Sequence, residues 1–414
     1  MNQGINEINQ CEVCGNLKLN PVLNLGQHPM CDDLIPVGDM RICREYPIDI
    51  LYCADCDTAH QRFQVAKHEL FPATYHYRSR FTADVLNGMQ NLVEGCEQRF
   101  GELALKKIID IGCNDGSLLS LFREKGGITI GIEPTDAADE AMNLGHVIYK
   151  DYLSEAVASK IVESHGYPDF ITFTNVFAHI EALDGVLSAL KVLMSESTIL
   201  VIENHYLGAI LEGNQFDTFY HEHPRTYSFG SFVRMAKRLN AKILDVNFPS
   251  RYGGNIRIFI GSSIRETDLN QTRMDALAQR ESTYGDAFEV LQKNIECWKH
   301  KKSKQITSLV EKYGPLRAKA FPGRAAILVK LLGLNETIIS AVYEKPGSLK
   351  IGHYLPGTRI PICSDDELFA SSVKTLPIIN FAWHIPQEIR TYLQKNNYSG
   401  NVIDILSNED FISE

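Results

Sequence analysis

Residues 107–119 read KIIDIGCNDGSLL, and this stretch decides the fold. The run 107–111 is largely apolar and β-branched, as in a buried strand, and a helical pattern begins at Ser117. Gly112 and Gly116 lie in the turn between them, where glycine lets the backbone bend sharply and approach a ligand closely. The stretch therefore predicts a strand, a glycine-rich loop and a helix.

The same alternation of apolar runs and helical stretches continues along the middle of the chain. The expected strands are 107–111, 128–132, 146–150, 169–174, 198–203, 242–248 and 255–261. Helices fit between most of them, for example at 117–125, 153–164 and 185–194. This alternation predicts a mostly parallel, doubly wound α/β sheet, in which a ligand binds at the carboxyl ends of the strands.

An acidic residue follows the second expected strand. Glu133 lies 21 residues beyond Gly112, where a carboxylate in this fold takes both hydroxyls of a ribose. The loop lacks the G-x-G-x-x-G pattern of dinucleotide binding, so a ligand without a pyrophosphate fits better. S-adenosylmethionine is therefore the expected cofactor. The expected cofactor-binding residues are Asp110, Gly112, Asn114, Asp115, Gly116, Glu133 and Asn175. The alternative is that the glycines only open a helix and that Glu133 is a surface residue.

Two C-x2-C pairs lie near the N-terminus, at Cys11 and Cys14 and at Cys53 and Cys56. Such pairs can present four thiolates tetrahedrally to Zn²⁺, and a site with four protein ligands has no open position for chemistry. We therefore expect a structural zinc ion, with residues 16–50 as a loop inserted between the pairs. The alternatives are coincidental cysteines or a redox C-x-x-C motif.

Titratable side chains follow the fourth and fifth expected strands. His179 and His205 come after these strands, and residues 217–223 read DTFYHEH, which includes Tyr220, His221, Glu222 and His223. Four histidines near neighbouring strand ends predict that at least one of them is catalytic. A second metal site at 221–223 is the alternative, but in an extended chain Glu222 points away from the two histidines.

The last third of the chain has two patterns. Residues 263–312 read as long helices with few glycines or prolines, which predicts a helical bracket between domains. Strands expected at 337–343, 376–382 and 401–406 alternate with helices, and this indicates a second, smaller α/β unit.

Composition disfavours several classes of protein. The 414 residues contain 41 Lys and Arg against 51 Asp and Glu, a net charge of −10, whereas nucleic-acid binding needs a basic face. No apolar run approaches the roughly 20 residues that span a bilayer, and the N-terminus does not read as a secretory signal. We expect a cytoplasmic protein that binds neither nucleic acid nor membrane. A monomer is compatible with the sequence, which does not determine the oligomeric state.

Taken together, these segments resemble the nucleotide-sugar C-methyltransferases, which add a branching methyl group to the ring of a keto-deoxysugar. The Tyr-His-Glu-His segment at 220–223 is the most specific of the matching pieces. The others are the four cysteines, 75–77, 110–116, 131–134, 175–179, 253–255 and 354–358. The segments 78–80 and 321–325 depart from the family pattern, and both lie where substrate contacts are expected. The resemblance therefore does not determine the sugar, the nucleotide or the ring carbon.

The resemblance implies a domain order. A zinc-binding domain is expected at residues 1–75 and a class I methyltransferase domain at 76–262. The helical bracket follows at 263–312, and a Rossmann-like domain that closes over the nucleotide-linked keto-deoxysugar is expected at 313–414. Tyr75, Tyr77 and Tyr354 are the expected substrate contacts.

The implied reaction is methylation at carbon, at C-3 of a 4-keto sugar, through an enolate. It needs a base, a hydrogen-bond donor for the developing oxyanion, and alignment with the methyl group. The resemblance favours His223 as the base, and Tyr220 can donate to the oxyanion. Glu222 can orient a neighbour, and His179 is a second candidate for holding the keto oxygen. The alternatives are an O-methyltransferase of a sugar or small metabolite, and a non-catalytic zinc-bearing nucleoside-binding protein.

Overall fold

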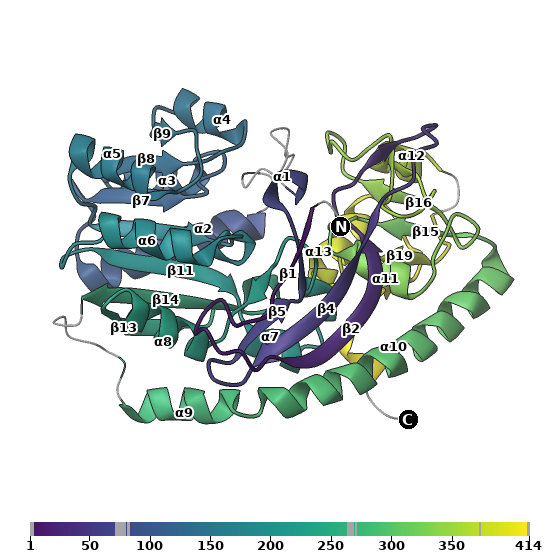
Figure 1. The fold of residues 1–414 in the computed structure, drawn as a ribbon. Coiled ribbons are helices and arrows are strands. Elements are labelled where there is room, and N and C mark those ends of the chain that lie inside the picture. The colour runs from purple at the N-terminus through teal and green to yellow at the C-terminus, as the bar shows by residue number, and fades with distance from the viewer. Residues whose placement is uncertain are drawn as a thin grey trace. The chain divides into compact units, whose positions relative to one another are not determined.

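In the computed structural model, the strand expected at residues 107–111 lies inside a seven-stranded sheet (Figure 1). The structure describes residues 4–70, 80, 83–262, 269, 271–371 and 374–411. The chain divides into two units. Unit 1 consists of Met1–Pro21, Leu51–Ile210 and Glu222–Gly285, and unit 2 consists of Val22–Ile50, Leu211–His221 and Asp286–Glu414.

The large sheet of unit 1 contains all seven expected strands. They are β7 (Lys107–Ile111), β8 (Ile128–Ile132), β9 (Val147–Tyr149), β10 (Phe170–Thr174), β11 (Ile199–His205), β13 (Ala241–Asn247) and β14 (Asn255–Ser262). Their order is β13-β14-β11-β10-β7-β8-β9. Only β14 runs antiparallel to its neighbours, β11 and β13, because the seven residues between β13 and β14 are too few for a parallel crossover. The prediction of a mostly parallel, doubly wound sheet is confirmed.

Helices alternate with these strands. They are α2 (Ala83–Phe100), α3 (Ser117–Glu124), α4 (Ala137–Asn143), α5 (Glu155–His165), α6 (Leu183–Leu193), α8 (Phe229–Arg238) and α9 (Gln271–Glu281). Local signals set their ends: Ser154 Oγ accepts from Val157 N at 3.3 Å at the start of α5, and Gly166 with φ +73° follows its end. One apolar cluster packs α2 and α3 against the sheet, and α5 packs against α6.

Strands of the N-terminal region form three further sheets, one of them the antiparallel pair of β3 (Ile35–Pro36) and β17 (His353–Tyr354). β1 (Ile5–Glu7) pairs with β6 (Phe63–Val65). A four-stranded sheet has the order β12 (Arg225–Thr226), β5 (Thr58–Gln61), β4 (Glu45–Cys53) and β2 (Asn20–Pro29). The division between the units falls inside β2 and β4, and also inside α7 (Leu207–Glu212) and α10 (Tyr284–Tyr313).

Unit 2 contains a parallel five-stranded sheet. Its order is β18 (Ile362–Ser364), β16 (Ile339–Glu344), β15 (Leu316–Lys319), β19 (Ile378–Asn380) and β20 (Val402–Asp404). The helices α11 (Ala325–Leu331), α12 (Asp365–Ala370) and α13 (Pro386–Lys395) alternate with these strands. The expected second α/β unit is confirmed, and β15 and β18 add two strands to the three that the sequence predicts.

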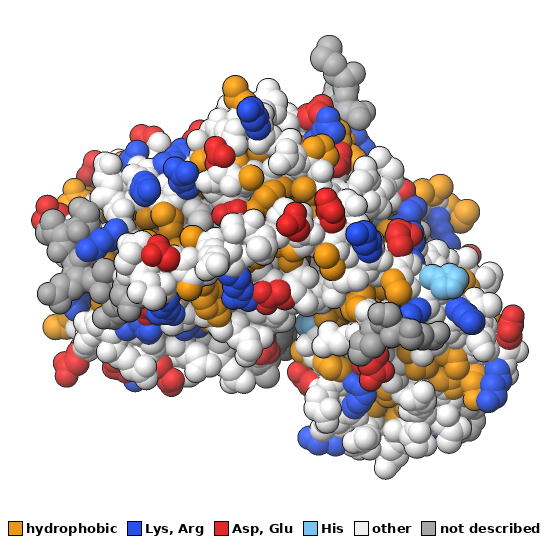
Figure 2. All heavy atoms as spheres, turned by 90° about the horizontal axis from the view of Figure 1, so that it is seen from below, with side chains coloured by type: hydrophobic (Ala, Val, Ile, Leu, Met, Phe, Trp, Pro, Cys, Tyr) orange, Lys and Arg blue, Asp and Glu red, His pale blue; other side chains and the backbone are white. Residues whose placement is uncertain are grey.

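No helix in the described ranges is long and apolar enough to cross a membrane. On the face drawn in Figure 2, acidic and basic side chains are interspersed among the described residues, and they do not separate into areas of one sign. Although the chain has a net charge of −10, this face therefore carries charges of both signs.

We predict that Phe259→Ala strongly destabilises unit 1. Phe259 on β14 is fully buried, and its ring centroid lies 5.8 Å from that of Phe100. Truncation removes apolar contacts and leaves a cavity, which costs about 3–5 kcal/mol of unfolding free energy. Urea unfolding followed by circular dichroism measures the change. Val147→Ala on β9 is the control, because Val147 is 46% exposed and its loss should cost under about 0.5 kcal/mol. Equal effects of the two variants would contradict the assigned core.

Candidate functional site

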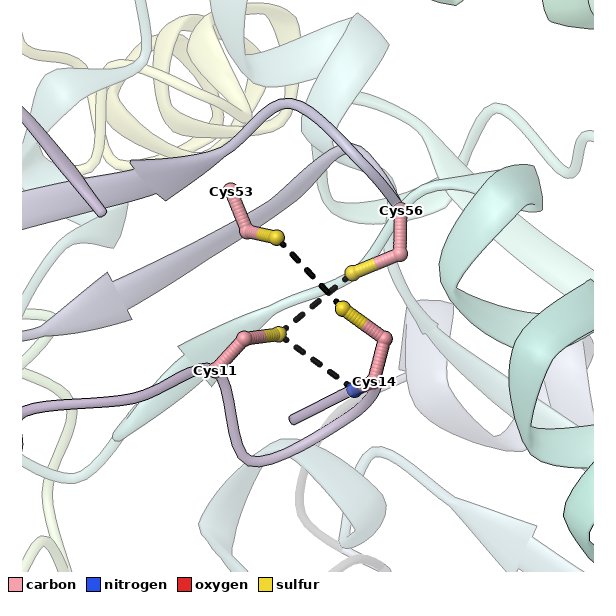
Figure 3. A group of neighbouring side chains, drawn as sticks. All are labelled: Cys11, Cys14, Cys53 and Cys56. Atoms are coloured by element: carbon pink, nitrogen blue, oxygen red, sulfur yellow. Dashed lines mark hydrogen bonds between the residues drawn. The ribbon is translucent and has the colours of Figure 1, made fainter. Parts of the chain in front are cut away.

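Four cysteine side chains converge in unit 1 (Figure 3). Cys11 and Cys14 come from a turn near the N-terminus, Cys53 ends β4, and Cys56 lies in the turn before β5. The four Sγ atoms lie within 4.8 Å of one another, with Cys11 to Cys56 at 3.5 Å and Cys14 to Cys53 at 3.6 Å. A tetrahedral Zn²⁺ with bonds of about 2.3 Å needs sulfurs about 3.8 Å apart. The donor set and its spacing therefore fit a closed zinc site.

Two N–H groups near the cluster donate hydrogen bonds to these sulfurs. The backbone N–H of Cys14 donates to Cys11 Sγ at 3.5 Å, and Asn16 Nδ2 donates to Cys53 Sγ at 3.7 Å. Such bonds spread the charge of thiolate ligands and fix their orientation. Among the described residues, these four cysteines are the only group of three or more His, Cys, Asp or Glu that could hold a metal ion.

The glycine loop after β7 has the conformation that its glycines allow. Gly112 has φ +69° and Gly116 has φ +78°, values that side chains disfavour. A Cβ on Gly112 would stand 2.7 Å from both Cγ atoms of Val176, so any side chain there would collide with the loop after β10. Packing against Val176 therefore requires glycine at position 112, and the approach of a ligand to this loop stays a prediction.

Glu133 is buried after β8 and reaches back to this loop. Its Oε2 accepts from Asn114 N at 3.0 Å, and its Oε1 accepts from Thr135 N at 2.9 Å and from Thr135 Oγ1 at 2.6 Å. A carboxylate has about four acceptor positions, and these donors use three of them. Binding of both ribose hydroxyls would therefore require Glu133 to exchange one of its present hydrogen bonds.

Two aspartates lie at this loop, Asp110 within β7 and Asp115 just before α3. Asp110 accepts from Thr172 Oγ1 at 2.6 Å, and burial raises the pKa of Asp110 to about 7. Asp115 Oδ1 accepts from Ser117 Oγ at 2.6 Å, and its Oδ2 accepts from Arg80 N at 3.1 Å. Asp115 therefore stabilises the loop at the start of α3.

Asn175 directly follows β10 and forms hydrogen bonds with residues of β11 and β14. It has φ +55°, and its backbone N donates to Glu203 O at 2.8 Å. Its side-chain oxygen accepts from Asn255 Nδ2 at 3.2 Å, and Asn255 Nδ2 also donates to Glu203 Oε1 at 3.1 Å. Arg257 Nε donates to Glu203 Oε2 at 2.5 Å. The predicted residue Asn175 thus lies in a buried polar network at the carboxyl ends of β10, β11 and the start of β14.

Three histidines cluster at the same edge of the unit 1 sheet. The ring of His223 lies 4.8 Å from that of His179 and 5.4 Å from that of His205, measured between centroids. His179 Nδ1 donates to Glu222 O at 2.8 Å. Burial lowers the pKa of His179 to about 4, although backbone hydrogen bonds to Glu222 and Asn175 favour the charged form. His179 is therefore neutral near pH 7.

The other predicted residues that the structure describes are divided between the two units. Tyr220 belongs to unit 2, whereas Glu222 and His223 belong to unit 1, so the division of the chain falls inside the Tyr-His-Glu-His segment. Tyr354 also belongs to unit 2, where its hydroxyl accepts from Gly38 N at 3.2 Å. Tyr75 and Tyr77 lie outside the described residues.

Sequence reasoning missed several partners of these groups. Thr172, which donates to Asp110, and Thr135, which donates to Glu133, belong to no motif. Arg257 and its partner Glu203 are 54 residues apart in the sequence. The antiparallel pairing of β11 with β14 places them opposite each other. The signal available for Asn255 was its place after two glycines, in one of the segments that carry the family resemblance.

Three protein-family models match successive parts of the chain. A zinc binding domain matches residues 11–71, a methyltransferase domain matches 81–246, and a C-methyltransferase C-terminal domain matches 250–403. With the sheet and the glycine loop, these matches define an S-adenosylmethionine-dependent methyltransferase.

More particularly, the chain is a C-methyltransferase with an N-terminal four-cysteine domain. It is 26% identical over 391 residues to the C-methyltransferase NovU of Streptomyces niveus, and the match covers 93% of this chain and 92% of that protein.

Two solved structures each match less than half of this chain. The magnesium protoporphyrin IX methyltransferase of Synechocystis PCC 6803 is 12% identical, with a TM-score of 0.33, covering 44% of this chain and 80% of that chain. The PH0226 protein of Pyrococcus horikoshii OT3 is 12% identical, with a TM-score of 0.36, covering 48% and 98%. These scores are too low to support an inference.

We predict one tightly held zinc ion per chain. Cys11→Ser should lose the metal and unfold at a lower temperature, because metal binding and folding of such a site are coupled. Cys297→Ser is the matched control, since Cys297 is exposed on α10 and outside the cluster. Metal analysis by mass spectrometry and thermal unfolding measure the two effects. A metal-free wild-type protein, or a Cys11→Ser variant of unchanged stability, would refute the zinc assignment.

Proposed function

We propose that the chain methylates a ring carbon of a nucleotide-linked keto-deoxysugar, at C-3 of a 4-keto sugar, through an enolate. The observation that carries the proposal is the histidine cluster, which stands at the carboxyl edge of the sheet that bears the cofactor loop. The match of residues 250–403 to the C-methyltransferase C-terminal domain supports transfer to carbon. The family resemblance of the Tyr-His-Glu-His segment supports the sugar substrate.

Carbon is a poor nucleophile unless a proton is first removed from it. A keto group next to the carbon allows this, because the charge then resides largely on the oxygen of an enolate. The protein has to supply a base and a donor for that oxygen. We assign His223 as the base, because imidazole is the side chain best suited to exchange a proton near neutral pH. His179 beside it is neutral, so it does not repel a proton that arrives at His223.

Tyr220 is the donor that we assign to the developing oxyanion, and Glu222 orients its neighbours. The backbone oxygen of Glu222 already holds His179 at 2.8 Å. His179 remains the second candidate for contact with the keto oxygen. Tyr75, Tyr77 and Tyr354 are assigned to the substrate, and we propose that residues 313–414 bind its nucleotide.

S-adenosylmethionine supplies an electrophilic methyl group when it is bound. The residues present fit it, because Gly112 and Gly116 form a tight turn without side chains and the buried carboxylate of Glu133 accepts from Asn114 N of the same loop, where we assign the ribose. We assign Asp110, Asn114, Asp115 and Asn175 to the same site.

We predict that Glu133→Ala weakens binding of S-adenosylmethionine. Two ribose hydroxyls would lose their acceptor, which costs on the order of 1–3 kcal/mol. Isothermal titration calorimetry measures the loss, and Glu133→Gln should lose less because it keeps one acceptor oxygen. Asp139→Asn is the control, since Asp139 on α4 is exposed and pairs with Lys150. Unchanged affinity in a folded Glu133→Ala protein would refute the ribose contact.

The function itself is tested by proton exchange at carbon. In deuterated water with S-adenosylhomocysteine, a 4-keto nucleotide sugar should gain deuterium next to its carbonyl, as followed by NMR. His223→Asn should abolish this exchange, because a positioned base contributes about 10² to 10⁴ in rate. Tyr220→Phe should slow it by about 10² to 10³. His300→Asn, at an exposed position of α10, should have no effect.

Other outcomes of this experiment assign the roles differently. Exchange that survives in His223→Asn and vanishes in His179→Asn identifies His179 as the base. With S-adenosylmethionine present, methylation of a hydroxyl without exchange at carbon would show an O-methyltransferase and refute the proposal.

A further inference from the structure

We propose that the ion pair between Glu12 and Arg225 positions the histidine cluster, so that the zinc knuckle, residues 11–14, sets the geometry of the reacting groups as well as supporting the fold. This inference rests on the proposed function, because it concerns His179 and His223 in the roles assigned above. All the residues that carry it belong to unit 1.

The guanidinium of Arg225 is enclosed by protein. Its side chain has no exposed surface, and β12 places it opposite His60 of β5. Its Nε donates to Tyr227 Oη at 3.0 Å. Its Nη1 donates to Glu12 Oε2 at 2.6 Å and to Glu181 O at 3.2 Å. Because burial strips a cation of its hydration, Arg225 needs a paired anion in this position.

The knuckle provides that anion. Glu12 lies between Cys11 and Cys14, whose turn is drawn in Figure 3, so ligation of zinc by both cysteines fixes the backbone on either side of it. The same Oε2 atom also accepts from Gln64 Nε2 at 2.7 Å. The carboxylate is therefore held on one side by the knuckle and on the other by Arg225.

Arg225 connects the two chain segments that carry the histidines. It follows His223 by two residues, and Glu181, whose carbonyl it binds, follows His179 by two residues. The bond from His179 Nδ1 to Glu222 O joins the same two segments at 2.8 Å. These two ties flank the His179 and His223 rings, whose centroids are 4.8 Å apart.

Loss of the arginine tie should therefore alter the ring geometry. A displacement of about 1 Å at reacting groups can cost on the order of 100-fold in rate. Lysine would keep the charge, but its single ammonium cannot present the planar fork that serves Tyr227, Glu12 and Glu181 together. Arg225 and Glu12 do not contact the reacting atoms in this scheme, so they are positioning residues.

The test compares Arg225→Lys and Glu12→Gln with Asp245→Asn. Asp245 pairs with Arg99 and Arg273 in the same unit, on β13, so its variant controls for loss of a charge pair. The first readout is the ¹⁵N spectrum of the histidine side chains in the zinc-loaded protein without substrate, assigned with His179→Asn and His223→Asn. Zinc content, cofactor affinity, and kcat and KM with the 4-keto nucleotide sugar are measured alongside.

We expect both positioning variants to shift the ring signals of His179 and His223, and Asp245→Asn to leave them unchanged. Zinc should remain at one per chain, cofactor affinity should stay within about twofold, and kcat should fall about 10- to 100-fold with little change in KM. Folded, zinc-loaded Arg225→Lys or Glu12→Gln protein with wild-type histidine signals would overturn the inference. If Arg225→Lys does not fold, Glu12→Gln decides, because it keeps an acceptor of the same size.

The spectra need no substrate, so they separate this inference from the proposed function. Shifted histidine signals in an enzyme that shows no carbon exchange would support the positioning role and refute the proposed chemistry. Unshifted histidine signals, in an enzyme that does catalyse carbon exchange, would refute the positioning role and support the proposed chemistry.

Discussion

The buried carboxylate of Glu203 holds three neighbouring strand ends together. Its two oxygens accept from Arg257 at 2.5 Å and from Asn255 at 3.1 Å, both on β14, and its backbone oxygen accepts from Asn175 after β10. Arg257 also donates to backbone oxygens of α2, including Gly88 O at 3.3 Å. A carboxylate with no exposed surface is tolerable only when such donors replace its hydration. The segment after β10, which carries Asn175 and His179, therefore starts from a fixed point.

The central sheet was predictable because its strands contain apolar, β-branched runs, several of them next to glycine, aspartate or asparagine. The signal fails in unit 2 for β15 and β18, which have four and three residues. Moreover, β15 reads Leu-Arg-Ala-Lys, and a lysine inside a parallel sheet contradicts the usual pattern of a buried strand. Lys319 is accommodated because its ammonium binds Asp365 at 2.9 Å, a partner that only the folded chain reveals.

The candidate site was predictable where spacing alone carries the chemistry, as in the four cysteines and in the glycine loop with Glu133. The spacing of residues in the sequence could not show that one motif is divided between the two units. His221 is an example, because its Nε2 donates to Tyr46 O at 3.1 Å in unit 2, whereas His223 lies among the histidines of unit 1. It also could not show the contact between Glu12 and Arg225, which are 213 residues apart in the chain.

The place of β14 has a consequence for synthesis on the ribosome. β14 is the last strand of the large sheet to be made, yet it lies between β11 and β13. Until it emerges, the edge of β11 lacks its partner, and an unpaired strand edge is open to pairing with other chains. Asn255 and Arg257, two of the donors that bind Glu203, arrive on this strand, and Arg251, which pairs with Glu203 Oε1 at 3.3 Å, lies just before it. A nascent chain that stops before Arg251 holds both an open strand edge and a Glu203 carboxylate without its cationic partners, so its middle region should depend on chaperones until translation passes β14.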